Sequence, residues 1–141
     1  MAHTESLWPT FDTVNLERDP RIILKEQAMF LEKATKNVLS AEIRTTADNQ
    51  STSRNKIIYD LQIVAPLLSD YRYNLLEIEG KIDTLYPLRI VPSSGEKEEV
   101  RNEREFIDAL ERIFKSDATK KIISVLLARS MDIEPLFLAE Y

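Results

Sequence analysis

The feature that most constrains the fold of this chain is the stretch from Lys56 to Val64, where apolar side chains recur at every second position. A period of two places alternate side chains on opposite faces of a β-strand. One face of the predicted strand is apolar throughout and carries Ile57, Tyr59, Leu61 and Ile63. Such a strand must pair with neighbours and be covered on its apolar face, which predicts a sheet packed against helices.

Two later stretches predict strands that pair with this one. Tyr71–Glu79 is rich in β-forming residues and is expected to end at Gly80. Tyr86–Val91 is shorter, and Pro87 near its start suits the edge of a sheet, because proline cannot donate to an inner ladder. Together the stretches favour an antiparallel meander.

The region before the first of these strands is ambiguous. In Leu39–Arg44 apolar and polar residues alternate, but the segment continues directly from a helical pattern. A first strand and a longer helix are therefore alternatives here. Residues 47–55 are rich in Thr, Asn and Ser and predict an exposed hairpin loop. If Leu39–Arg44 is a strand, the sheet has about four strands.

A helix is predicted to begin at Asp19-Pro20, before the sheet. The aspartate can accept backbone N–H groups, and proline at the first helical position loses no hydrogen bond. The apolar stripe of this helix includes Ile23, Phe30 and Ala34.

Two more helices are predicted after the sheet. Asn102 and Glu105 form a capping pattern ahead of an apolar stripe. A further helix over residues 118–129 has more apolar positions than one stripe needs. The expected fold class is α+β, with an N-terminal helix, an antiparallel sheet of about four strands, and two C-terminal helices packed on one face.

The first residues differ from the rest of the chain. Residues 1–18 show no period and are expected to form an N-terminal arm that can be flexible. The arm contains three large apolar residues: Leu7, Trp8 and Phe11. Residues 19–141 are expected to fold as a single α+β domain, since 141 residues are one domain's worth of chain.

The composition removes most catalytic classes. The chain has no cysteine, one histidine, His3, and two glycines, Gly80 and Gly95. Thiolate chemistry is therefore excluded, and imidazole chemistry needs a positioned ring that a terminal histidine does not offer. Two isolated glycines cannot build a glycine-rich phosphate loop. We expect no cofactor.

Charge and hydropathy limit the partners. The chain has 19 Lys and Arg against 24 Asp and Glu, a net charge of -5, which argues against nucleic-acid binding because phosphate affinity requires a basic patch. No stretch has the length of a membrane span, and residues 1–8 lack the pattern of a secretory signal. We expect a soluble, cytoplasmic protein that binds neither nucleic acid nor membranes.

One pattern suggests chemistry. Asp60 is followed, nineteen positions later, by Glu79-Gly80-Lys81. In outline this resembles the Asp…Glu-x-Lys core of the restriction-endonuclease-like nucleases, over Asp60 to Lys81 only. The resemblance implies a metal-dependent phosphodiesterase in which Asp60 and Glu79 bind a divalent metal ion and Lys81 positions the attacking water. Alternatively, Asp60 and Glu79 are solvent-facing strand residues.

The C-terminal helix and tail offer more apolar surface than one sheet face and one helix would cover. Partner binding would bury this surface, or the helix closes the core itself. Tyrosines of the strands can likewise line a groove or stabilise the sheet. We therefore expect a non-enzymatic interaction module, regulatory, adaptor, chaperone-like or immunity-type, that binds another protein or itself as a homodimer. The candidate partner-binding residues are Tyr71, Tyr73, Leu126, Leu136 and Phe137.

Overall fold

The computed structural model describes residues 4–11, 17–48 and 55–139. The elements are α1 (Pro20–Ala34), β1 (Ser40–Asp48), β2 (Lys56–Ala65), a 3-10 turn η1 (Pro66–Leu68), β3 (Tyr71–Lys81), β4 (Leu88–Pro92), β5 (Glu98–Val100), α2 (Glu103–Phe114) and α3 (Asp117–Ala139). The strands form one antiparallel sheet in the order β1-β2-β3-β4-β5. The α+β prediction is confirmed, with five strands in place of about four.

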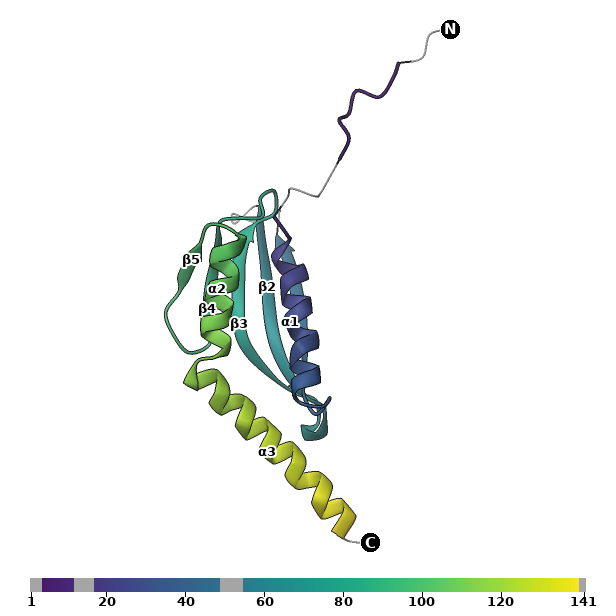
Figure 1. Cartoon of the computed structure of the whole chain (residues 1–141), viewed down its shortest axis with the longest axis vertical. Coiled ribbons are helices and arrows are strands. Elements are labelled where there is room, and N and C mark those ends of the chain that lie inside the picture. Colours follow the sequence, from purple (N-terminus) through teal and green to yellow (C-terminus); the bar gives the residue numbers. More distant parts are fainter. Residues whose placement is uncertain (1–3, 12–16, 49–54, 140–141) are drawn as a thin grey trace.

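The two faces of the sheet differ in what lies over them. α1 and α2 lie over the same face, which we call the covered face (Figure 1). Its side chains are apolar and buried: Tyr59, Leu61, Ile63, Leu76, Ile78, Leu88, Ile90 and Val100. Leu24 from α1 and Phe106 from α2 complete this core. The opposite face, which we call the open face, carries many charged residues, and no described helix lies over it (Figure 1).

The start and end of α1 follow from local chemistry. Asp19 Oδ1 accepts a hydrogen bond of 2.8 Å from the backbone N–H of Arg21, as the predicted helix start requires. After Ala34 the helix stops, because Lys36 and Asn37 adopt left-handed conformations with φ of 51° and 64°. The backbone can then enter β1 at Ser40. Of the two alternatives for Leu39–Arg44, the strand is the one observed.

Two strand boundaries differ from the predictions. β3 continues through Gly80 to Lys81, because the absence of a side chain at Gly80 makes room for Leu88 of the next strand. β4 begins at Leu88, directly after Pro87, and lies between β3 and β5. The prediction that Pro87 marks an edge strand was therefore wrong: Pro87 precedes the strand, so it takes no place among the hydrogen-bonded residues of the sheet.

The C-terminal part adds one strand and a longer helix. The segment between β4 and α2, for which no element was predicted, contributes the short strand β5. α2 begins at the predicted cap, where Asn102 Oδ1 accepts a 2.9 Å hydrogen bond from the N–H of Glu105. α3 does not stop near Arg129 but runs to Ala139, past the end of the sheet (Figure 1). None of the helices in the described ranges is long and apolar enough to cross a membrane.

Candidate functional site

Three carboxylates from two adjacent strands lie together on the open face. In the β2–β3 register Asp60 stands opposite Glu77 and Ile58 opposite Glu79, so Asp60 and Glu79 are diagonal neighbours on one face. The structure thus brings the two carboxylates of the nuclease-like pattern onto the same surface. It also adds Glu77, which the period of two in β3 could have placed beside Glu79.

The electrostatics of this acidic cluster are uneven. Glu79 Oε1 lies 3.6 Å from Lys56 Nζ, and Glu79 Oε2 lies 3.8 Å from Arg89 Nη1. Burial raises the pKa of Glu77, and a hydrogen bond with Glu79 and the charges of Asp60 and Glu79 raise it further. Asp60 Oδ1 is buried and has no hydrogen-bond partner among the described residues. At Glu77 the cluster therefore holds a proton more tightly than an isolated carboxyl group would.

The arrangement is that of a charged strand surface. In the part of the chain that the structure describes, no three acidic or histidine side chains are grouped so that they could hold a metal ion. Lys81 is exposed at the end of β3, opposite Lys56, and both oxygens of Glu79 face cations. The geometry gives no open coordination site at Glu79, and the nuclease chemistry stays a prediction.

The tyrosines of the strands differ in how deeply they are buried. Tyr59 is buried, its hydroxyl donates to Asp19 Oδ1 at 3.3 Å, and burial raises its pKa to about 12. The hydroxyl of the half-buried Tyr73 forms a 2.9 Å hydrogen bond with Ser93 Oγ. Tyr71, at the start of β3, is 47% exposed. Of the two tyrosines predicted to bind a partner, Tyr71 offers the larger free surface.

The other predicted partner-binding residues lie on α3. Leu126 is buried, with 4% of its surface exposed, so in this structure its side chain belongs to the core and is not available to a partner. The backbone of α3 is helical at Leu136 and Phe137, but the side chains of both residues lie outside the described part of the chain.

An apolar groove lies on the covered side of the molecule, between α1 and the beginning of α3. It has a volume of about 250 Å³ and is floored by Leu61 and Ile63 of the sheet. Its walls include Phe30 and Ala34 of α1 and Ile123 of α3. We call this space the α1–α3 groove.

Small side chains explain why the α1–α3 groove is present. Ala28 and Ala34 on α1 and Ala41 on β1 line it, and none of them is large enough to fill the space between helix and sheet. Only Gln27 and Thr119 among the lining residues are polar. The helical period predicts that Phe30 and Ala34 lie on the core stripe of α1, yet both are exposed, so periodicity alone could not reveal the groove.

Comparison with known proteins gives no relative for this chain. No family model, no curated protein and no solved structure matches it. The class it can be assigned to is the one its own structure defines, an α+β protein with helices on one face of a five-stranded meander. Its function is argued from its surfaces.

Proposed function

We propose that the protein is a non-enzymatic binding module, soluble and cytoplasmic, that takes up an apolar segment of a protein partner in the α1–α3 groove. The observation that carries the proposal is the groove itself, which is almost entirely apolar and open to the surface between two helices. Apolar pockets that desolvate one or a few anchoring side chains are typical centres of protein interfaces.

The size of the groove supports a protein segment as its occupant. A cavity of about 150 Å³ is enough for one benzene ring. The 250 Å³ of the groove therefore fit one or two large apolar side chains. Sites for small molecules and cofactors are mostly larger, roughly 300–1,000 Å³, and hold several placed polar groups.

The lining gives little basis for catalysis. Gln27 and Thr119 are neither general acids nor general bases, and catalysis of that kind needs a titratable group within hydrogen-bond reach of the reacting atom. Phe30 stands at the groove with 59% of its surface exposed, so apolar contact area continues beyond the groove itself. Recognition is the chemistry that these side chains favour.

A photo-cross-linking amino acid at position 34 tests this proposal. Ala34 is an exposed helical residue that lines the groove, and Ala128 is an exposed residue of α3 that does not. We expect the probe at position 34 to capture a protein through an apolar segment, and the probe at position 128 to capture little. Ala34→Arg should abolish capture by a probe placed at Phe30, whereas Ala128→Arg should leave it unchanged. Equal labelling from positions 34 and 128 would contradict the proposal.

A further inference from the structure

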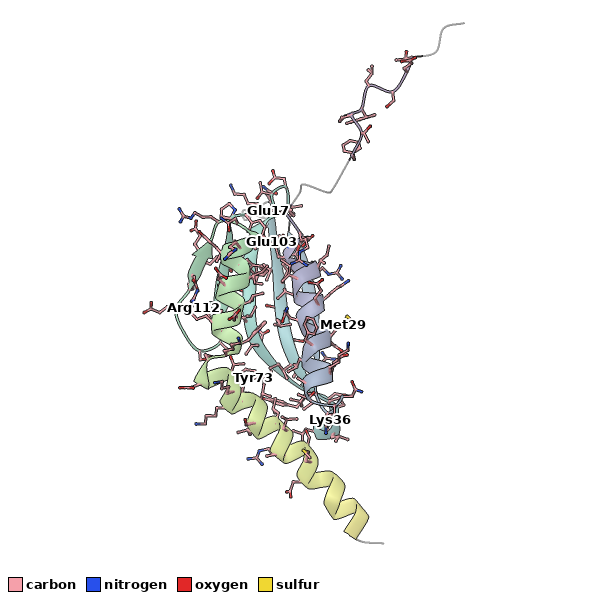
Figure 2. All side chains as sticks on the ribbon, viewed as in Figure 1. Glu17, Met29, Lys36, Tyr73, Glu103 and Arg112 are labelled. Atoms are coloured by element: carbon pink, nitrogen blue, oxygen red, sulfur yellow. The ribbon has the colours of Figure 1, made fainter. Side chains whose placement is uncertain are left out.

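The two edges of the sheet differ in length and in protection. β5, at one edge, has three residues, and hydrogen bonds from Arg112 to Glu98 tie it to α2 (Figure 2). β1, at the other edge, has nine residues and pairs with β2 in an unbroken register. Natural edge strands are commonly protected from further pairing by short length, proline, lysine or a bulge, and β1 has none of these. β1 is therefore an edge to which another strand can be added.

The outer side of β1 offers a row of backbone hydrogen-bonding groups. In an antiparallel pair every second residue directs its N–H and C=O to the neighbouring strand, and the residues between direct theirs away from it. The sheet places β2 on one side of β1 and no described strand on the other. No backbone hydrogen bond from another described segment reaches β1 from that side. An extended segment that lies along β1 would pair with these groups.

The side chains of β1 are incompletely covered at the same edge. Ala41 and Ile43 lie on the covered face and pack against the core, but both are only partly buried. Glu42 and Arg44 lie on the open face and are exposed. Arg72 donates to one oxygen of Glu42, Oε2, and a carboxylate can accept further donors through the other. The edge therefore presents an apolar residue between an acidic and a basic one.

We propose that β1 binds an extended segment of a partner protein, which adds to the sheet as a further antiparallel strand. The segment carries an acidic residue opposite Arg44, an apolar residue opposite Ile43 and a basic residue opposite Glu42. Opposite charges that face each other across two strands stabilise the pair, and like charges destabilise it. The apolar residue covers the part of Ile43 that the protein's own core leaves exposed. This site goes beyond the proposed function, because it uses the β1 edge and not the α1–α3 groove.

The position of α1 argues against a second copy of the chain as the partner. α1 packs along β1 more closely than along any other described strand. If two copies joined through β1, both α1 helices would lie on the same side of the joined sheet. Paired strands lie about 4.8 Å apart, so the two helices would be separated by roughly 5 Å. Packed helices need about 8–10 Å between their axes, so the partner strand must come without such a helix.

The N-terminal arm of the same chain lacks the charges that β1 requires. Its only Lys or Arg is Arg18, and this side chain is held by Glu26, to which it donates a 2.8 Å hydrogen bond. Pro9 lies among the large apolar residues of the arm and has no N–H to donate to a strand. Figure 1 shows residues 4–11 well clear of the sheet. The partner segment therefore belongs to another protein.

Two labelled synthetic peptides test the proposal on the full-length protein by fluorescence anisotropy. One has the order Thr-Val-Glu-Ile-Arg-Val-Thr, and the other exchanges its two charges, Thr-Val-Arg-Ile-Glu-Val-Thr. We expect the first peptide to bind at least about fivefold more tightly, because it opposes β1 with two opposite-charge pairs where the second has two like-charge pairs. Glu42→Arg combined with Arg44→Glu should reverse this preference. The matched control, Lys121→Asp combined with Asp132→Lys, exchanges two exposed charges on α3 and should leave the preference unchanged.

Hydrogen exchange of the backbone amides of residues 40–47 locates the bound peptide. In the chain alone every second amide should exchange rapidly at all protein concentrations, and the first peptide at ten times its Kd should slow that exchange roughly tenfold. Amides already protected in a dilute monomer would show that the chain's own arm occupies the edge, and protection that rises with a doubled mass would show a second copy. Equal affinity for the two peptides, or no protection by either, would show that β1 is not a docking site. Any of these results overturns the inference, and none of them affects the capture expected from the probe at position 34.

Discussion

On the covered face of the sheet the central strands meet through Leu61 and Leu76, whereas on the open face the same strands meet through Asp60 and Glu77. One residue of backbone separates the two environments, because alternate side chains of a strand point to opposite faces. The covered face is stabilised by the packing of apolar side chains, which does not depend on pH. On the open face, stability depends on interactions between charged side chains, and side-chain volume matters little. Substitutions on the two faces should therefore change the free energy of unfolding in different ways.

The largest effect is expected at Phe106, on the covered side. Its ring is fully buried and meets the ring of Tyr86 at a centroid distance of 6.2 Å. Phe106→Ala should reduce the free energy of unfolding by about 3–5 kcal/mol, because it leaves a cavity in the core. Phe30→Ala is the matched control, since Phe30 is 59% exposed, and it should cost less than about 1 kcal/mol. Urea denaturation followed by circular dichroism measures both, and similar losses would contradict the assignment of Phe106 to the core.

A smaller loss is expected where the covered face has no room to spare. A Cβ atom added at Gly80 would lie 2.6 Å from Leu88 Cδ2, and Leu88 is buried. Gly80→Ala should therefore cost about 1–3 kcal/mol through overpacking. Leu88→Val removes volume at the point of contact, so the double variant should lose less than the sum of the two single losses. Strict additivity in urea denaturation would show that the two sites do not touch.

Much of the fold could be predicted because it is encoded locally. The side-chain oxygens of Asp19 and Asn102 begin their helices by accepting nearby backbone N–H groups, as sequence alone indicated. The strand over residues 56–65 was visible in its period of two. These signals need no knowledge of the rest of the chain.

The remaining features depend on contacts between distant segments. β5 has three residues, two of them glutamates, and it is a strand because it pairs with β4. Gly80 stays within β3 because Leu88 of the next strand occupies the space beside it. The α1–α3 groove arises where alanines from α1 and β1 face each other. No local pattern distinguishes such alanines from those of a filled core.

Glu98 carries a charge interaction that links the sheet to a helix, so its substitution tests an ion pair outside the open face. Its two carboxylate oxygens accept hydrogen bonds of 2.7 Å and 2.9 Å from Arg112, which tie β5 to α2. The hydrogen bonds to Arg112, followed by its charge, lower the pKa of Glu98. A lowered pKa contributes stability above the ordinary value, and that contribution is lost as the pH falls through the lowered pKa. Glu98→Gln should cost about 0.5–1 kcal/mol at pH 7, since both side chains are partly exposed, and the cost should decrease as the pH falls below the ordinary glutamate value of 4.5. Glu99→Gln, at the exposed neighbouring position, is the control and should change little throughout this range.

The smallest effect is expected on the open face, and it has the opposite sign. The pKa of Glu77 is raised by burial first and by its carboxylate neighbours second. A carboxyl group with a raised pKa favours the folded state while it is protonated, and this contribution is lost as the pH rises through the raised value. Glu77→Gln should therefore increase the free energy of unfolding at pH 7 by about 0.2–1 kcal/mol, the range of a cross-strand pair, because it removes a like charge opposite Asp60. Below the ordinary glutamate pKa of 4.5 the gain should disappear, because Glu77 is then neutral in both states.

Glu42, on the same face, provides a control for the direction of the expected change in stability. A hydrogen bond with Arg72 lowers the pKa of Glu42, so Glu42→Gln removes a favourable contact and should not stabilise the protein at pH 7. Urea midpoints of the two variants at pH 7 and pH 4 separate the cases. If Glu77→Gln and Glu42→Gln shift the midpoint in the same direction, the open face responds to net charge alone. Opposite shifts would mean that the position of each carboxylate in the sheet determines its contribution, because the two substitutions change the net charge of the chain by the same amount.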